Sequence, residues 1–306
     1  MKTSNIVCER AIFMKKKVHI IIVSVLLIVF TLSSCGNLNE SISDNSTQNE
    51  KLKIQCPTLT PSVLYEDDVL TVTIDGLEYN KSFKTYIVKA KIENHSDYTI
   101  SYSANWIDIN GYTISALVFG DVYGGKFAEA DIGFHIDELL VAGINNIQEI
   151  SFELNFYYKD TNETICKLSP TLQTSDYGLY TETYDFDGEE VYNTENCKIK
   201  IKPNDNPTVI NPIIIYVENK TDNPMIINYD NIALNDQMVM TFMSGPYVLP
   251  HSHRIEVINI VYFDSTPDIS NLSSFTSEFS IMPYRADGSF STADIIKVPA
   301  ISIALP

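Results

Sequence analysis

The chain has 306 residues, of which 44% are hydrophobic and 20% charged, and its formal net charge is −18. This apolar content is sufficient for folded cores in a chain of this length. The excess of acidic residues opposes binding to nucleic acid and to anionic lipid headgroups, and we therefore exclude nucleic acid as a partner.

An export signal is the first element that the sequence predicts. Three lysines follow Met14, and residues 18–32 form an apolar run that is interrupted only by His19, Ser24 and Thr31. The run has the length of a signal-peptide core and is short for a membrane span. We expect residues 1–34 to be a signal peptide, in which Met14 looks like the natural start of translation.

Cys35 ends this segment in the sequence Leu32-Ser33-Ser34-Cys35, which resembles the bacterial lipobox. A cysteine thiolate accepts the diacylglyceryl group, and two acyl chains hold firmly because each buried methylene contributes about 0.8 kcal/mol. We expect Cys35 to be lipidated and the mature protein to be extracytoplasmic, anchored to the cell membrane. The alternative is an ordinary secretory signal or an N-terminal membrane anchor. Cleavage before Cys35 removes five basic residues and one acid, which changes the net charge to −22.

A polar tether follows the lipidated cysteine. Residues 36–50 contain no aromatic and only two aliphatic residues, so they cannot bury enough apolar surface to fold. We assign residues 35–60 to the lipidated cysteine and this tether, whose flexible reach is roughly 25 Å.

The rest of the chain contains an internal repeat with a constant offset of 125 residues, which matches 87–111 with 212–236 and, without a gap, 144–150 with 269–275. Asn94 falls on Asn219, and Asn110 falls on Asn235. Two long copies are too few for a solenoid and indicate tandem domains. We place the first domain at 61–176, a linker at 177–188 and the second domain at 189–306.

Both copies have the pattern of β-strands. Apolar residues alternate with polar ones at 70–74, 88–92 and 198–202, and this period of two indicates strands with one buried face. Turn formers follow at Asp75-Gly76, 94–97 and 219–222. Residues 135–143 predict one or two helical turns between strands. The lengths fit an all-β protein with two tandem antiparallel β-sandwiches.

The order of these segments resembles a known type of domain. A strand, the motif "IENHSD", a strand, the motif "WIDING" and the segment "ELLVAGINNIQEISFELNFYYKDTNETI" follow one another. This order looks like the Ig-like domains of unknown function that are repeated in lipoproteins of Gram-positive, Clostridia-like bacteria. The resemblance covers nearly all of 65–302 and implies an Ig-like fold and an envelope location. The second copy departs from it, because Asp236 replaces Gly111.

Four carboxylates at the linker are weak candidates for a calcium site, namely Asp185, Asp187, Glu189 and Glu190. They alternate around a glycine as calcium ligands do, but the full twelve-residue spacing is missing. The alternative is a solvated acidic linker, and we expect no cofactor other than this weak Ca²⁺ candidate.

His251 and His253 could form two ligands of a metal site, but the sequence supplies no third ligand. We interpret them as residues of an exposed loop. Tyr177, Tyr180 and Tyr184 form a candidate interface, through which the domains pack together or a partner is recognised.

Three cysteines follow Cys35 in the chain, and they are Cys56, Cys166 and Cys197. One disulfide, preferably Cys56–Cys166, and three reduced thiols are equal alternatives for an exported protein.

The sequence lacks a G-x-S-x-G elbow, and no serine or cysteine stands in a recognisable catalytic arrangement with a histidine. We therefore expect a non-catalytic, lipid-anchored envelope protein that binds or spaces an envelope protein or glycan. The alternatives are a carbohydrate- or solute-binding lipoprotein and, less favoured, an envelope hydrolase.

Overall fold

The computed structural model describes residues 56–181, 186–204, 213–235, 237–241, 245–258, 260–261, 273–285 and 289–304. The chain divides into two units, residues 1–51 and 52–306, and every described residue belongs to the second. The predicted signal peptide, Cys35 and most of the tether therefore lie outside the described residues. Within the described ranges, no helix is long and apolar enough to cross a membrane.

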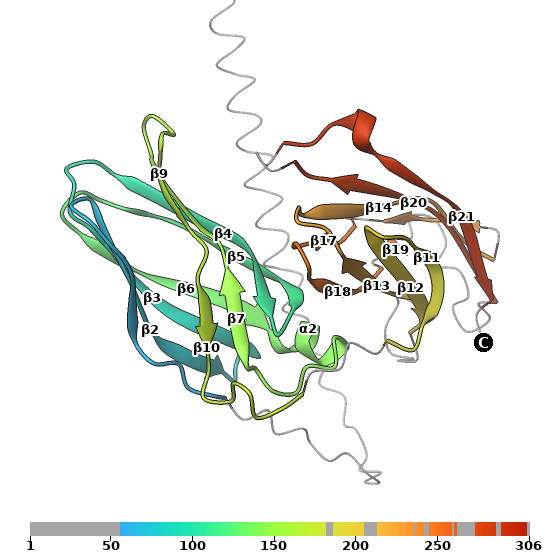
Figure 1. Ribbon diagram of the computed structural model, residues 1–306, viewed down its shortest axis with the longest axis horizontal. Helices are drawn as coiled ribbons and strands as arrows, with labels where there is room; N and C mark the ends of the chain where they lie inside the picture. The colour runs from blue at the N-terminus through green and yellow to red at the C-terminus, as the bar shows by residue number, and fades with distance from the viewer. Residues whose placement is uncertain are drawn as a thin grey trace, which may run out of the picture. The chain divides into compact units, whose positions relative to one another are not determined.

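The first sandwich comprises two antiparallel sheets (Figure 1). One has the order β1-β2-β3-β6, with β1 at Ser62–Glu66, β2 at Leu70–Asn80, β3 at Thr85–Asn94 and β6 at Phe127–His135. The other contains β4 (Ile100–Ile109), β5 (Tyr112–Val122), β7 (Glu149–Phe152), β8 (Leu154–Tyr158), β9 (Thr164–Leu168) and β10 (Thr171–Gln173). Every second residue of β3 is buried, which confirms the predicted alternation.

The second sandwich repeats this arrangement. Four of its strands have the order β11-β12-β13-β18, with β11 at Glu189–Asn193, β12 at Cys197–Pro203, β13 at Ile213–Asn219 and β18 at His253–Val257. They are continuous, through the pairing of β18 with β5, with the second sheet of the first sandwich, and together form one ten-stranded sheet. The facing strands are β14 (Met225–Leu234), β15 (Gln237–Met238), β17 (Tyr247–Val248), β20 (Ser274–Pro283) and β21 (Ile296–Ala304). Two further short strands, β16 (Met240–Thr241) and β19 (Ile260–Val261), pair with each other, and a 3₁₀ turn, η2, spans Thr292–Asp294.

Two buried asparagines show that the copies share their internal hydrogen bonds as well as their strand order. The amide of Asn94 donates to the carbonyls of Tyr98 and Val122, and its oxygen accepts from Ser96. Asn219, 125 residues later, donates to the carbonyls of Asn223, Val248 and Leu249 and accepts from Thr221. Each asparagine therefore ties two turns together at one end of its sandwich.

A second pair of asparagines occupies the opposite ends. Asn110 has a positive φ of 53°, and its side-chain oxygen accepts from the backbone N–H groups of Gln148 and Glu149. Asn235 has a φ of 46° and accepts in the same way from Ser273 and Ser274. The offset of 125 thus holds at both ends of the repeat.

The offset is not constant between these points. Phe127 pairs with Glu93 in the first copy, whereas His253 pairs with Glu218 in the second, so β6 and β18 are related by 126 residues. The prediction of a gapless repeat was therefore wrong here, because strands can absorb one extra residue without losing their pairing partners.

The predicted turn at Asp75-Gly76 was also wrong. Strand β2 continues through it to Asn80, and the register with β3 shifts between Ile74 and Gly76. Glycine marked a β-bulge at this position rather than a chain reversal. The predicted helical turns are confirmed as α2 (Ile136–Val141), which contacts β5, β6 and β18.

Each sandwich has its own hydrophobic core. The first is centred on residues of β2 to β8, and the second on residues of β12 to β21. Tyr216 and Ile255 of the second sandwich belong to the core of the first, so the two cores meet at this point. The predicted all-β, antiparallel sandwich fold is confirmed.

Candidate functional site

The hairpin turn between β4 and β5 provides the first part of a polar junction between the sandwiches. Asn110 and Gly111 both have positive φ, as a tight turn requires, and the Asp108 carboxylate accepts from the N–H of Gly111 at 2.7 Å. This hydrogen bond fixes the conformation of the turn where β5 begins.

Strand β18 of the second sandwich extends the sheet at this turn. The N–H of His253 donates to the carbonyl of Gly111 at 2.8 Å, and His253 pairs in parallel with Tyr112. The N–H of Leu249 donates to the Thr113 hydroxyl at 3.0 Å. Backbone hydrogen bonds therefore connect one sandwich to the other.

Ser252 is the buried centre of this contact. Its hydroxyl donates to Asp108 Oδ2 at 2.5 Å and lies 2.9 Å from the Thr113 hydroxyl. Burial raises the pKa of the Asp108 carboxyl, although hydrogen bonds from Ser252 and Gly111 oppose the rise. The serine hydroxyl is consequently part of a structural network with a carboxylate and a threonine.

Arg254 is buried beside this network. Its guanidinium brings a positive charge next to the Asp108 carboxylate and the two hydroxyl groups. Its Nη1 donates to the carbonyl of Thr113 at 3.0 Å, and its Nη2 donates to the Ser115 hydroxyl at 2.9 Å. The same Nη2 lies 3.1 Å from the carboxylate of Glu256 and 3.4 Å from that of Glu138. One guanidinium thus joins β5, α2 and β18.

Glu138 and Glu256 differ in their surroundings. Glu138 also accepts from the N–H of Ser115 at 2.9 Å. Burial raises the pKa of Glu256, and Arg254 opposes this rise. A shifted pKa of this kind occurs in binding sites and in structural networks alike.

An aromatic group covers one side of the guanidinium. Trp106 stacks on Tyr247 with ring centroids 5.0 Å apart, and Arg254 lies 5.4 Å from the centroid of the Trp106 ring. Tyr284 meets Tyr247 edge-on at 5.7 Å. Burial raises the pKa of Tyr247 to about 12, so its hydroxyl stays protonated.

A groove of about 1130 Å³ opens over these residues. Its lining combines aromatic rings with carboxylates, and it includes Trp106, Glu138, Glu149, Tyr247, Glu256 and Tyr284. Aromatic faces and carboxylates together suit a ligand with C–H faces and hydroxyl or amine groups.

The weak calcium candidate does not form a site from its described members. Asp187 is exposed and pairs with Lys202 at 2.6 Å, which lowers the pKa of its carboxyl. Glu190 accepts from Asn193 at 3.1 Å. Asp185 lies outside the described residues, and among those described no three His, Cys, Asp or Glu side chains are grouped to hold a metal.

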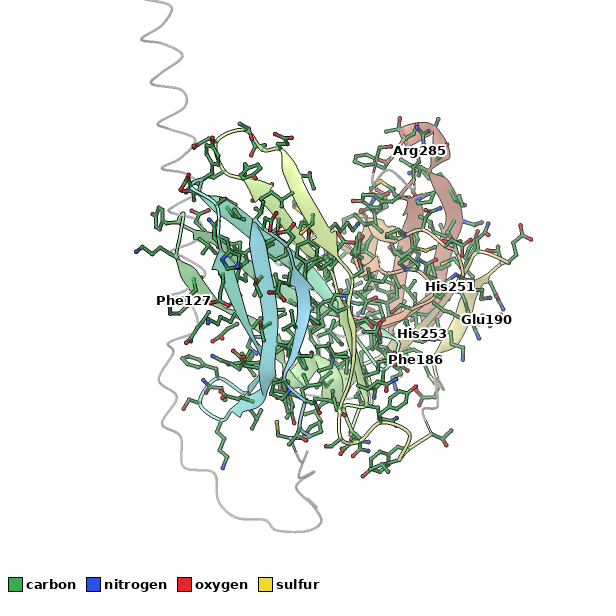
Figure 2. The ribbon with its side chains drawn as sticks, turned by 60° about the vertical axis from the view of Figure 1, so that its left-hand side comes forward. Phe127, Phe186, Glu190, His251, His253 and Arg285 are labelled. Carbon is green, nitrogen blue, oxygen red and sulfur yellow. The ribbon has the colours of Figure 1, made fainter. Side chains whose placement is uncertain are left out.

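His251 and His253, labelled in Figure 2, have separate partners. His251 Nε2 lies 2.8 Å from the exposed carboxylate of Asp222. His253 Nδ1 lies 2.6 Å from the hydroxyl of Tyr216, and burial lowers the pKa of this imidazole. His251 is in a loop as predicted, whereas His253 begins β18, so the prediction of a shared exposed loop was wrong for His253.

Phe186, at the end of the predicted linker, makes an aromatic contact with the second sandwich. Tyr177 and Tyr180 are half-exposed, and Tyr184 lies outside the described residues. Phe186, labelled in Figure 2, stacks on Tyr216 with ring centroids 5.4 Å apart. The interface role of the three tyrosines stays a prediction.

The three described cysteines are free, so the preferred Cys56–Cys166 disulfide is not formed. The Cys56 thiol lies 3.8 Å from the carbonyl of Leu77 on β2, whereas Cys166 lies on β9 in the other sheet of the first sandwich. The alternative of reduced thiols agrees with the structure.

Sequence reasoning missed Arg254, Ser252 and Trp106 as members of one site. A signal was present for Arg254, because Arg254 and Glu256 alternate with Ile255 and Val257 along one strand. Two opposite charges on one face of an apolar strand indicate a buried or bridging pair.

No protein-family model matches the chain, and no curated protein matches it. Among solved structures, the YadV chaperone is 10% identical, covers 78% of this chain and 100% of its own, and has a TM-score of 0.24. The E. coli chaperone DraB is 10% identical, with 81% and 97% covered and a TM-score of 0.23. A conserved domain protein from Bacillus anthracis is 12% identical, with 86% and 96% covered and a TM-score of 0.27. Values this low support no functional argument.

Proposed function

We propose that this protein is a lipid-anchored component of the cell envelope that binds or spaces another envelope component and catalyses no reaction. The observation that carries the proposal is the sequence of three lysines, an apolar run and the lipobox ending at Cys35. The acidic mature chain and the buried junction between its sandwiches support a displayed binding module or spacer. The resemblance to Ig-like lipoprotein domains supports the same location.

The lipid anchor is tested with Cys35→Ser in the whole chain, expressed in a bacterium with lipoprotein processing. The variant is expected to leave the membrane fraction or to accumulate as the larger precursor. Cys56→Ser is the matched control and is expected to be processed and retained. Unchanged size and membrane retention of Cys35→Ser would contradict lipidation.

A second candidate function is the binding of a carbohydrate or another small solute. The observation that favours it is the groove of about 1130 Å³ in which Trp106, Tyr247 and Tyr284 lie among carboxylates. Binding to a glycan array is the measurement, with Tyr284→Ala as the groove variant. Tyr98→Ala, an exposed tyrosine at the far end of the first sandwich, is the control. Equal signals from both variants would argue against the groove.

A further inference from the structure

The groove lies on one face of the ten-stranded sheet. On this face, Val217 of β13 belongs to the second core, and its pairing partner on β18, Arg254, lines the groove. Beyond β18 the face continues onto β5, where Ser115 accepts from Arg254 and also lines the groove. The groove is thus the place at which the interior of the second sandwich opens onto the outer face of the first.

Three alanines of the first sandwich occupy positions that carry large polar side chains in the second. By strand register, the equivalent pairs are Ala128 and Arg254, Ala130 and Glu256, and Ala104 and Tyr229. Polar groups inside a sandwich cost free energy unless partners satisfy them. The junction accounts for Arg254 and for its ion-pair partner Glu256, but it leaves Tyr229 without an explanation.

The Tyr229 hydroxyl is the member of this cluster that has no partner. It is buried and makes no hydrogen bond with any group that the structure describes. Burial, and after it the carboxylate of Glu256, raises the pKa of Tyr229 well above its ordinary value. The end of the ring that carries the hydroxyl lies against the groove wall, because a Cβ on Gly245 would be 3.1 Å from Tyr229 Cζ. A buried hydroxyl without a partner is rare and marks a place where a ligand or its bound water can supply one.

The groove also carries an excess of negative charge. Among the described residues that line it, two are basic, Arg254 and His251, and six are acidic, namely Asp108, Asp137, Glu138, Glu149, Glu153 and Glu256. The guanidinium of Arg254 is already paired with Glu138 and Glu256. In the described parts of the chain, the carboxylates of Asp137 and Glu149 have no ion-pair partner. These two carboxylates are therefore open to a cation that enters the groove.

Aromatic rings determine which kind of cation fits. Tyr247 and Tyr284 meet edge-on in the wall of the same groove. Aromatic faces pack against the C–H faces of an organic ligand, and they attract an ammonium group as well. A neutral sugar would use the rings and leave the carboxylates uncompensated, whereas a bare metal ion would use the carboxylates alone. A sugar ring that bears an ammonium group uses both.

We propose that the groove binds a sugar with free amino groups and discriminates against the same sugar once these groups are acetylated. The inference rests on the second candidate function, the binding of a small ligand in this groove. The ammonium groups lie toward Asp137 and Glu149, and the C–H faces of the sugar rings lie against Tyr247 and Tyr284. Acetylation removes the positive charge and adds bulk, but leaves the sugar ring as it is.

The test is isothermal titration calorimetry of the whole chain in a mild detergent, with glucosamine trisaccharide and N-acetylglucosamine trisaccharide as the two probes. At about pH 6, where the amines are protonated, the amino sugar is expected to bind about tenfold more tightly than the acetylated sugar. Its affinity is expected to fall as salt is added, because salt screens exposed charges. Equal affinity for both sugars would overturn the selectivity and leave the second candidate function in place.

Two variants place the effect in the groove. Glu149→Gln removes one unpaired carboxylate and is expected to weaken binding of the amino sugar by about fivefold. Glu66→Gln, in an exposed position on β1 outside the groove, is the matched control and is expected to bind like the wild type. Far-UV circular dichroism is expected to be unchanged in both variants.

Three results would overturn the proposal beside equal affinity for the two sugars. They are unchanged binding by Glu149→Gln, a loss of binding in Glu66→Gln that matches the loss in Glu149→Gln, and binding of neither sugar by the wild type. In the last case the glycan array decides the second candidate function by itself, because it presents sugars without amino groups as well.

Discussion

At the scale of single residues, the chain uses buried amides where a connection between turns must be held. Asn94 and Asn219 each satisfy backbone carbonyls on two turns at once, and each accepts from a hydroxyl residue two positions later. A truncated side chain would leave these buried carbonyls without donors, and that cost exceeds the net value of the hydrogen bonds.

Asn94→Ala is expected to lower the free energy of unfolding by about 2–4 kcal/mol, because several buried backbone groups lose their partner. Urea unfolding measures the difference. Asn80→Ala is the control, since Asn80 accepts only from Ser82 and Phe83 in an exposed turn. Equal losses in both variants would show that the buried hydrogen bonds of Asn94 add no more to the free energy of unfolding than those of an exposed turn.

The free cysteines are expected to react in a defined order. Burial raises the pKa of Cys197 to about 12, and its side chain is buried in the second core. Cys56 and Cys166 are only partly buried. Iodoacetamide at pH 8 is therefore expected to label Cys56 and Cys166 in the folded protein and Cys197 only in urea. Mass spectrometry of peptides reads the order, and early labelling of Cys197 would contradict it.

Glu256 is expected to make stability fall as the pH rises. The raised pKa means that, between the ordinary value of 4.5 and the raised one, the folded chain binds a proton that the unfolded chain has released. Its contribution is fully present below pH 4.5 and is lost as the pH rises through the folded pKa. Glu256→Gln is expected to flatten this fall in a series of denaturant titrations.

The control for the Glu256 prediction is Asp187→Asn. The pKa of Asp187 is lowered by Lys202, so its titration lies below its ordinary value of 3.8 and outside the same window. A Glu256→Gln profile identical to the wild type would contradict the prediction.

At the scale of secondary structure, alternation of apolar and polar residues predicted β3 and β12 well, because each strand has one buried face. Bulges were harder. Gly76 was interpreted as a turn, yet cross-strand pairing carries β2 past it. The α2 helix has only six residues, and such a helix depends on packing of Leu139 and on the contacts of Glu138 rather than on its own propensity.

Long-range contacts explain what the sequence could not show about the candidate site. Asn94 and Asn219 were visible as a repeat because both copies keep the residue. Arg254 and Trp106 are not repeated in the other copy, so the repeat does not reveal them. They meet only because β18 lies beside β5. The linker carboxylates were grouped in sequence, but the sequence could not show that Asp187 pairs with Lys202 on β12.

Gly124→Ala is expected to lower the free energy of unfolding by about 1–3 kcal/mol, because the new methyl group would press on the backbone of Asp97. Gly133→Ala is the control in β6, since its nearest neighbour is the methyl group of Thr85 at 3.2 Å. Thermal unfolding compares the two. A smaller loss for Gly124→Ala than for Gly133→Ala would disprove the tight contact between the turns.

At the scale of the whole described unit, the Arg254 guanidinium, a short parallel strand pairing and the packing of Tyr216 and Ile255 couple the two sandwiches. Removal of one partner from a buried charge network costs about 3–5 kcal/mol. That cost falls on the junction, because Arg254 contacts both sandwiches.

Arg254→Met is therefore expected to separate one cooperative unfolding transition into two, one for each sandwich. Differential scanning calorimetry measures the number of transitions. Arg285→Met is the matched control, because Arg285, labelled in Figure 2, forms an exposed ion pair with Asp294 within the second sandwich. It is expected to keep the wild-type profile. Two transitions in the wild type would remove the basis for this prediction.

The parallel pairing of His253 with Tyr112 also determines how the unit responds to mechanical load. A pull that parts the sandwiches acts on one pair of strand positions, on the hydrogen bonds of Leu249, Ser252 and Arg254, and on the packing of a few apolar side chains. Unzipping a sandwich requires the breaking of full antiparallel ladders such as β2 with β3. Under tension we therefore expect the junction to yield before the antiparallel ladders, so that the two sandwiches part while each keeps its fold.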